Sequence, residues 1–424
     1  MSVNAYFDRF GFCGRQIVEP PPSDLGITVV IPCRSEPDLL GSLESLQACT
    51  RPSCAVEVIV VINAAADASS EVHAQNLSTL KEASAWAAER EDSRLKFHFL
   101  HFPDLPPKHA GGGLARKIGM DEALRRFADA GRLRDGIIAC YDADCRCEPN
   151  YLTAIERHFA EHPRSPACSI YFEHPLAGPF RAEVYDAIAA YELHLRYYVQ
   201  ALRYAGFPHA FHTIGSCMAV RAEVYMQQGG MNKRQAGEDF YFLHKIIPLG
   251  GFTDLTTTTV YPSPRASLRV PFGTGKAIAD CLASEPIRTY PLQAFLDLKR
   301  FFESLPALFK WDAASRLDVG ITWPESIRSF LAAQNFFGAL KEIQANASTE
   351  AAFRKRFFRW CNSFRTMKFV HHARDRFYGE AKIEEAPAKL LALVREDDAR
   401  RRALPVRELL QSYRRLDRAG ASAG

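Results

Sequence analysis

Two pairs of acidic residues could bind a metal ion or transfer a proton. The first pair is Asp142 and Asp144, which are two positions apart. Residues i and i+2 of an extended chain point to the same face, so these carboxylates would lie close together. Two close carboxylates repel each other unless a cation binds near them, and oxygen ligands of this kind suit Mg²⁺ or Mn²⁺. Two solvated acids in a loop are the alternative. The apolar run at residues 137–141, which leads directly into the pair, favours the metal site.

The second pair is Glu238 and Asp239, which stand at the start of a predicted helix. The apolar residues that follow at helical spacing are Phe240, Phe242, Leu243 and Ile246. Acids at a helix N-terminus are favoured by the helix dipole alone, which is the plain structural explanation. The functional alternative is a general base held on a rigid helix start, able to take a proton from a weak nucleophile such as a hydroxyl group.

The elements that would position these acids alternate between strands and helices. Short apolar runs predict strands near residues 27–31, 56–62, 95–102 and 137–141, and helical periodicity lies between them, including a long segment near 71–90. This alternation is typical of an α/β fold with a mostly parallel central sheet flanked by helices. In such sheets ligands bind beyond the carboxyl ends of the strands, where the first acidic pair would stand.

The pattern along the chain predicts four parts. Residues 1–25 form an N-terminal lead-in, 26–280 the catalytic α/β domain, 281–418 a helical C-terminal region and 419–424 a disordered tail. The boundary near 280 is where strand signals stop. Beyond it, one helix face carries Phe353, Phe357, Trp360 and Phe364.

Composition excludes several classes of protein. The net charge of +4 among 424 residues gives no signal for nucleic-acid binding. The 11 cysteines do not form a zinc-binding or disulfide framework and are expected to be reduced thiols. The chain lacks a signal-peptide pattern and an apolar run of about 18 residues, so a cytoplasmic protein is expected. The hydrolase motifs G-x-S-x-G and H-E-x-x-H do not occur.

Five segments in order resemble the family 2 glycosyltransferases, which have the GT-A fold. The resemblance covers roughly residues 26–275, and its segments are 29–32 (VVIP), 113–119 (GLARKIG), 141–144 (YDAD), 215–221 (GSCMAVR) and 237–239 (GED) with the preceding Gly229 and Gly230. No single motif is specific, but five in the same order form a combined signal. The fold expected from the resemblance is therefore a GT-A nucleotide-diphospho-sugar transferase domain.

The resemblance implies roles for individual residues. Asp144 would bind the metal ion, Mn²⁺ or Mg²⁺, with help from Asp142, which would also hold the ribose. Asp239 would be the base that deprotonates the acceptor, with Glu238 as second candidate. The residues expected at the donor are Pro32, Arg34, Glu36, Asn63 and Arg116, and those on the acceptor side are Gly215, Ser216 and His212. Many relatives carry Asp-Asp where this chain has Ile62-Asn63, which leaves the base of the nucleotide open.

Two basic segments complete the prediction. Residues 263–269 resemble a mobile segment of the relatives, in which Arg265 or Arg269 would neutralise the leaving diphosphate; a solvated basic loop is the alternative. Residues 353–376 are rich in Arg and Lys beside aromatic residues. They could contact the inner face of a membrane or a lipid-linked acceptor. The other interpretation packs the aromatic rings on the catalytic domain and leaves the arginines solvated.

The predicted activity is metal-dependent transfer of a sugar from a nucleotide-diphosphate donor, a UDP-sugar first among them, to a hydroxyl of a carbohydrate or lipid-linked acceptor. Direct displacement would invert the anomeric centre, and the missing membrane span favours a non-processive enzyme. A retaining glycosyltransferase on the same fold is the near alternative. A sugar nucleotidyltransferase, for which the loop at 33–36 lacks the expected glycines, and a non-catalytic sugar-nucleotide binder are the others.

Overall fold

The computed structural model describes residues 1–267, 273–283, 286–311, 323–395 and 404–419. The chain divides into two compact units. The first comprises Met1–Phe180, Thr213–Ala279 and Arg418–Gly424, and the second Arg181–His212 and Asp280–Asp417. Residues 181–212, which the sequence pattern placed within the α/β domain, therefore belong to the second unit. Among the described helices, none is both long enough and apolar enough to cross a lipid bilayer.

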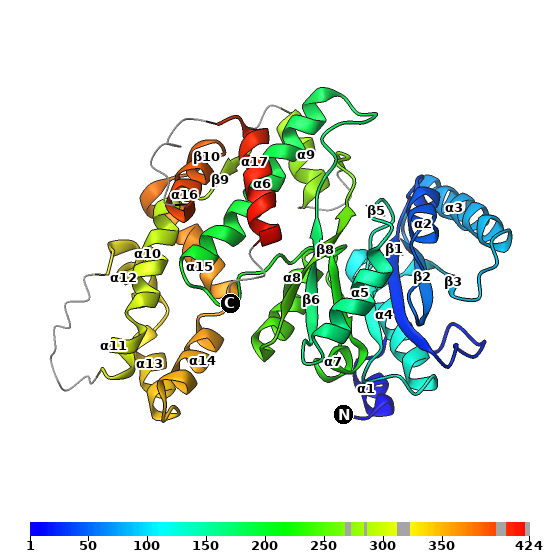
Figure 1. Ribbon diagram of the computed structural model, residues 1–424, viewed down its shortest axis with the longest axis horizontal. Helices are drawn as coiled ribbons and strands as arrows, with labels where there is room; N and C mark the ends of the chain where they lie inside the picture. The colour runs from blue at the N-terminus through cyan, green and yellow to red at the C-terminus, as the bar shows by residue number, and fades with distance from the viewer. Residues whose placement is uncertain (268–272, 284–285, 312–322, 396–403, 420–424) are drawn as a thin grey trace. The chain divides into compact units, whose positions relative to one another are not determined.

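An eight-stranded sheet forms the core of the first unit in the described residues (Figure 1). Its strand order is β3-β2-β1-β4-β7-β6-β8-β5. The strands are β1 (Leu25–Cys33), β2 (Ala55–Ala65), β3 (Leu95–Leu105), β4 (Ile137–Cys140), β5 (Arg146–Cys147), β6 (Ala167–Phe172), β7 (Met218–Arg221) and β8 (Thr253–Tyr261). Strands β3, β2, β1 and β4 pair in parallel, whereas β7 runs antiparallel to both β4 and β6. The expected α/β fold with a mostly parallel sheet is confirmed.

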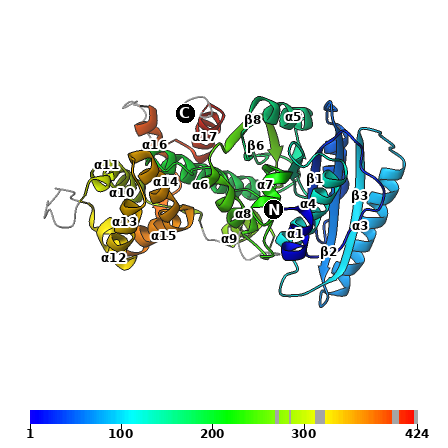
Figure 2. The same cartoon turned by 90° about the horizontal axis from the view of Figure 1, so that it is seen from below.

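Helices cover both faces of the parallel half of the sheet. Helices α2 (Leu39–Gln47) and α3 (Ser70–Ala88) pack together, α3 lies on β2 and β3, and α4 (Gly112–Asp129) lies on β1 and β2. Figure 2 shows α3 and α4 on opposite sides of these strands. Right-handed crossovers explain this arrangement, because the chain moves outward from β1 to β3 and then returns past β1 to β4. The other helices of this unit are α1 (Val3–Phe10), α5 (Tyr151–Glu161), α7 (Ala222–Gln227), α8 (Glu238–Ile246), the 3₁₀ turn η1 (Ile247–Leu249) and most of α9 (Thr274–Leu282).

The N-terminal segment is docked on α4, in contrast to the loose lead-in that the sequence suggested. Tyr6 of α1 is fully buried, and its hydroxyl donates to Asp121 Oδ1 at 2.6 Å. Tyr225 donates to the same oxygen at 2.7 Å, and Lys117 lies 3.0 Å from the carboxylate. The backbone N–H of Ile17 donates to Glu122 at 2.9 Å. These polar contacts hold the N-terminal segment on α4.

The second unit is helical, as expected. Its helices are α6 (Ala182–Tyr204), α10 (Leu292–Glu303), α11 (Leu305–Phe309), α12 (Glu325–Ala333), α13 (Phe336–Ala345), α14 (Glu350–Trp360), α15 (Ser363–Ala373), the π-helix η2 (Arg374–Tyr378), α16 (Glu385–Arg395) and α17 (Val406–Ala419). Two short antiparallel strands, β9 (Arg288–Thr289) and β10 (Ala381–Lys382), occur beyond residue 280, where no strand was expected.

The aromatic residues of α14 form the core of this second unit. Phe357 is fully buried against Phe301 and Phe302 of α10, and Phe353 packs on Phe309. These partners all belong to the helical unit, so the rings pack within it, whereas the sequence had suggested packing on the catalytic domain. The arginines and lysines at 354–356 and 359 are exposed, as in the solvated alternative.

Candidate active site

The first acidic pair follows β4 directly, at the carboxyl end of the parallel strands. Residue Cys140 ends the strand opposite Val30 of β1, and the N–H of Tyr141 still donates to the carbonyl of Val30 at 3.0 Å. The chain then turns, and the N–H of Cys145 donates to the carbonyl of Asp142 at 3.1 Å. Asp142 and Asp144 stand on this turn with side chains 37% and 29% exposed. Both side chains are therefore partly exposed to solvent.

A buried arginine connects this turn to the second acidic pair. The guanidinium of Arg116, near the start of α4, hydrogen-bonds both Asp142 Oδ1 and Glu238 Oε1. The Arg116 side chain is only 6% exposed. Burial opposes its positive charge, but Asp142 and Glu238 together raise its pKa above the ordinary value. The sequence placed Arg116 at the donor. In the structure it pairs with these two carboxylates and holds the two acidic segments together.

Gly215 gives Arg116 its space. A Cβ atom at this position would lie 2.8 Å from Nη2 and 3.0 Å from Nη1 of the guanidinium. The neighbouring Ser216 is buried, with its hydroxyl 3.4 Å from the sulfur of Cys217. The segment that the sequence assigned to the acceptor therefore closes over the arginine from one side.

We expect Gly215→Ala to destabilise the first unit by about 1–3 kcal/mol, because overpacking forces the guanidinium off its carboxylates. Activity should fall with stability, since both acidic pairs depend on Arg116. Thermal melting and steady-state rates check this. Gly14→Ala is the matched control, because a Cβ there would meet no atom within 4 Å. Equal melting temperatures for the two variants would contradict the prediction.

The second acidic pair opens helix α8, as the sequence indicated. Gly237 precedes the helix in the left-handed conformation with φ of 68°, which a residue with a side chain rarely adopts. Glu238 is buried and occupied by Arg116. Asp239 is half-buried, and its Oδ1 accepts the N–H of Phe240 at 2.7 Å. Burial and the nearby Glu238 raise the pKa of Asp239 to about 6, although Arg116 partly offsets them. Such a carboxylate is suited to accept a proton near neutral pH.

Arg265, which follows β8, reaches the same region. Its guanidinium forms a two-pronged contact with the buried carboxylate of Glu36, with Nη1 3.1 Å from Oε1, and Nη2 lies 3.6 Å from Asp144 Oδ2. These hydrogen bonds to Glu36 raise the pKa of Arg265. The basic segment and the loop after β1 therefore meet beside Asp144. Arg269, its predicted companion, lies outside the described residues.

The other residues expected at the donor lie on or after β1 and β2. Pro32 is half-buried and pairs with Val61 in the sheet, and Arg34 is half-buried in the loop that follows. Asn63 is 1% exposed, and its amide donates to the carbonyl of Cys33 at 2.9 Å. Among the described residues no partner is found for the Asn63 side-chain oxygen. Asn63 thus ties β2 to β1 at the edge of the site and keeps one acceptor atom available.

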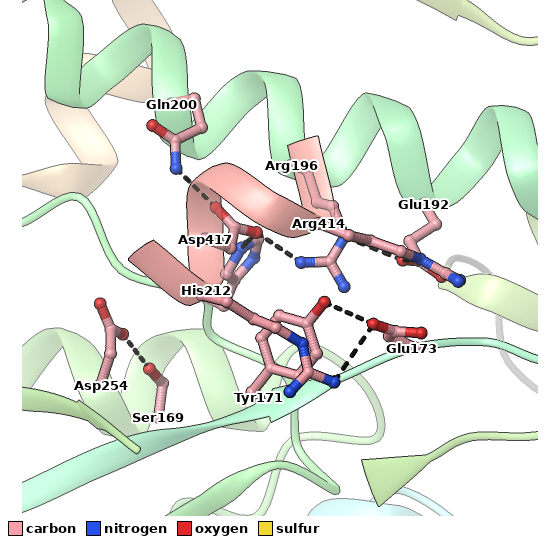
Figure 3. Close-up of polar contacts among 11 residues, drawn as sticks. Ser169, Tyr171, Glu173, Glu192, Arg196, Gln200, His212, Asp254, Arg414 and Asp417 are labelled. Carbon is pink, nitrogen blue, oxygen red and sulfur yellow. Dashed lines mark hydrogen bonds and ion pairs between the residues drawn. The ribbon is translucent and has the colours of Figure 1, made fainter. Parts of the chain in front are cut away.

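His212 is not in the unit that contains the acidic pairs. It belongs to the second unit, where its Nε2 is 3.0 Å from Asp417 Oδ2 on α17 (Figure 3). Gln200 and Arg196 of α6 contact the same carboxylate. Burial opposes the charge of Asp417, but His212 and Arg196 hold its pKa well below the usual range. These contacts indicate that His212 helps to anchor α17 on α6.

Figure 3 also shows a polar cluster of the first unit, formed where β6 ends. Arg418 lies 3.4 Å from Glu173 and donates to Thr259 at 3.0 Å, and its guanidinium lies 4.1 Å from the ring centroid of Tyr171. Tyr171 donates to Glu173 at 2.6 Å. No residue of this cluster was singled out in the sequence, and no local pattern marks a contact between positions 245 apart.

The donor chemistry of the first acidic pair fits a hard divalent cation. Among the described residues, no group of three or more His, Cys, Asp and Glu side chains gathers at metal-binding spacing. Two carboxylates on one turn are nevertheless the protein share that Mg²⁺ commonly uses, with waters and substrate phosphates completing its shell. Asp142 and Asp144 are therefore the residues that would hold such an ion.

Residues 28–229 match the model of the family described as Glycosyl transferase family 2. No curated protein matches the chain at a significant level. Solved structures with similar chains include S. aureus TarS 1-349 in complex with UDP-GlcNAc, at 12% identity and a TM-score of 0.39, covering 93% of this chain and 91% of that one. Another is the mannosyltransferase PcManGT from Pyrobaculum calidifontis with GDP-Man and Mn²⁺, at 14% identity and a TM-score of 0.34, covering 84% and 93%. These scores describe a distant likeness.

Proposed function

We propose, from the match of residues 28–229 to the Glycosyl transferase family 2 model, that the chain is a metal-dependent enzyme that transfers a sugar from a nucleotide-diphosphate donor to an acceptor hydroxyl. The observation that carries the proposal is the charge network of the first unit. Arg116 joins the acids after β4 to the acids that open α8. The turn proposed to bind the cation and the proposed proton acceptor Asp239, whose pKa is raised to about 6, are thereby connected through one buried side chain.

The proposed reaction is a direct displacement at the anomeric carbon. Asp239 takes the proton of the acceptor hydroxyl. The acceptor oxygen forms the new glycosidic bond to the anomeric carbon while the bond between that carbon and the diphosphate breaks. The nucleoside diphosphate leaves with the bonding electrons. A Mn²⁺ or Mg²⁺ ion, when bound, supplies charge stabilisation to that leaving group. Attack on one face inverts the anomeric configuration, so we propose an inverting, non-processive GT-A enzyme, with a UDP-sugar as the first donor to test.

The other proposed roles concern the leaving group and the nucleotide. Arg265 would turn from Glu36 and Asp144 to the diphosphate oxygens, since guanidinium groups bind phosphates through paired hydrogen bonds. Pro32, Arg34 and Asn63 would line the nucleotide, and the buried side-chain oxygen of Asn63, for which no partner is found among the described residues, would act as a hydrogen-bond acceptor. The acceptor is a carbohydrate or lipid-linked hydroxyl, on the side of Gly215 and Ser216.

The test is a donor panel. UDP-, GDP- and dTDP-sugars are incubated with the full chain, Mn²⁺ and candidate acceptors, and the released nucleoside diphosphate is measured. We expect release with one nucleotide class, dependent on the metal and abolished in Asp144→Asn. Analysis of the product anomer separates inversion from retention. No release above background with any donor and acceptor would refute the proposal.

We expect the rate to depend on the protonation of Asp239. Its raised pKa means that the carboxylate is ionised above about pH 6 and protonated below it. A base must be ionised to act, so log kcat/KM should be level near neutral pH and fall with unit slope below about pH 6. A pH–rate profile with the best donor checks this. A level profile down to pH 4.5 would exclude Asp239 as the base.

A further inference from the structure

One face of helix α2 carries polar side chains that contact the turn after β4, where the proposed metal-binding residues Asp142 and Asp144 lie. Asp38, Ser42, Ser45 and Cys49 follow one another at intervals of four, three and four residues, the spacing that aligns side chains along a helix. Asp38 is the residue before the helix, and Cys49 lies just beyond it. The apolar residues Leu39, Leu43 and Leu46 pack into the core. Polar residues on a partly buried helix face call for specific partners.

Those partners are residues 143–147, immediately after Asp142. The Ser42 hydroxyl is fully buried and lies 2.8 Å from the carbonyl oxygen of Ala143 and 2.7 Å from that of Cys145. Ser45 accepts the N–H of Cys147 at 2.9 Å. Every one of these contacts joins positions about a hundred residues apart, so they appear only in the fold.

The same helix face also fixes the side chain of Arg146. Its Nη2 donates to Asp38 at 2.7 Å, and its Nη1 lies 3.3 Å from the Ser42 oxygen. The guanidinium lies against the backbone at Gly41, where a Cβ atom would overlap it. Residues of helix α2 and the preceding Asp38 therefore contact both the backbone of this turn, at residues 143–147, and the side chain of Arg146.

Ser42 contacts the backbone on both sides of Asp144. Ala143 lies between the two carboxylate residues, and Cys145 follows the second. A hydroxyl has one proton, so Ser42 donates to one of the two carbonyls at a time while remaining within reach of both. Either bond holds the peptide backbone that carries Asp144. Loss of a group that orients metal-binding residues through hydrogen bonds typically lowers metal affinity about 10–100-fold.

We propose that Ser42 is a positioning residue, whose hydroxyl holds the 143–145 backbone so that Asp142 and Asp144 reach the same cation. The inference rests on the proposed function, because it assumes that these acids bind the metal ion. It assigns no chemistry to Ser42 itself. Losing the hydroxyl should leave the carboxylates in place but poorly aligned, and the first property to change should be metal affinity.

The experiment measures Mn²⁺ binding to the full chain by the electron paramagnetic resonance signal of free Mn²⁺, with and without UDP. Ser42→Ala should weaken binding about 10–100-fold, and Ser42→Thr, which keeps the hydroxyl, should recover most of it. Ser42→Cys keeps the volume without a strong donor and provides the same comparison if the alanine variant does not fold. The rate with the best donor should fall in parallel.

Ser165→Ala is the matched control. Ser165 is also buried in the first unit and donates to a backbone carbonyl, that of Ala167, at 2.9 Å, but it lies outside the acidic site. Its loss should lower the melting temperature and leave Mn²⁺ affinity unchanged. If Ser42→Ala behaves in the same way, Ser42 is structural only and the inference is wrong.

The wild-type arm distinguishes this failure from a failure of the proposed function. If wild-type protein binds Mn²⁺ and Asp144→Asn abolishes binding, the metal site stands and only the Ser42 comparison decides the inference. If wild-type protein with UDP binds no Mn²⁺, or Asp144→Asn binds it normally, the metal role of the acids is refuted, and the positioning role with it.

Discussion

Replacing Asp239 by Asn should lower kcat by about 10²–10⁴-fold, the usual contribution of a positioned general base. Asn has nearly the same shape and its side-chain oxygen can still accept the N–H of Phe240, so the fold should persist. The acidic limb of the pH–rate profile should disappear from the residual rate. Steady-state kinetics with the donor identified by the panel, together with thermal melting, check both expectations.

The stability of this variant provides an independent test. The folded-state pKa of Asp239, about 6, lies above its value in the unfolded chain, so its protonated form stabilises the folded state and that contribution is lost as pH rises through about 6. At pH 7 Asp239→Asn should therefore melt at or above the wild-type temperature. Glu238→Gln is the contrast, because it removes a partner of Arg116 and should melt lower. If Asp239→Asn were fully active, Asp239 would not be the base and another group would have to accept the proton.

Arg116→Met should cost both stability and activity. Removing one partner of a buried ion pair commonly destabilises by about 3–5 kcal/mol, because the remaining charge stays buried and unpaired. Here Glu238 is left buried and Asp142 loses its cation. Since Arg116 lowers the pKa of Asp239, its loss should also move the acidic limb of the rate profile above pH 6. Denaturant unfolding and a pH–rate profile measure the two effects.

Arg126→Met is the control that separates the loss of stability from the shift of the pH–rate profile. Arg126 is fully buried on the same helix and pairs with the equally buried Glu57, away from the acidic site. It should lose stability to a similar degree without moving the pH limb. If Arg116→Met also leaves the limb unmoved, Arg116 serves the fold alone, and the electrostatic link between the two acidic pairs is refuted.

The parallel half of the sheet was predictable because buried strands are continuous apolar runs. The run at 137–141 also located the first acidic pair, since residues that leave a parallel strand emerge at the ligand-binding edge. The start of α8 was predictable from Gly237 and the two acids after it. Strands β6, β7 and β8 were not predicted; β7 is four residues long and the threonine-rich β8 lacks an apolar run.

The contacts that assemble the site were beyond sequence reasoning. Arg116 stands 26 residues from Asp142 and 122 from Glu238, and no spacing rule relates them. The resemblance placed Arg116 at the donor, and only the three-dimensional arrangement reveals its two carboxylate partners. Ser42 gave no signal either, because a serine on an amphipathic helix is ordinary. The small size of Gly215 was visible, but the guanidinium that requires it was not.

The docking of helix α1 has a practical consequence for protein engineering. Deleting the first twenty residues would remove the hydrogen bond from Tyr6 to Asp121. Asp121 is only 4% exposed and lies on α4, the helix that also carries Arg116. Shortened versions should therefore express poorly or lose the alignment of α4. A purification tag is better joined ahead of the exposed Ser2, which leaves the docked helix undisturbed.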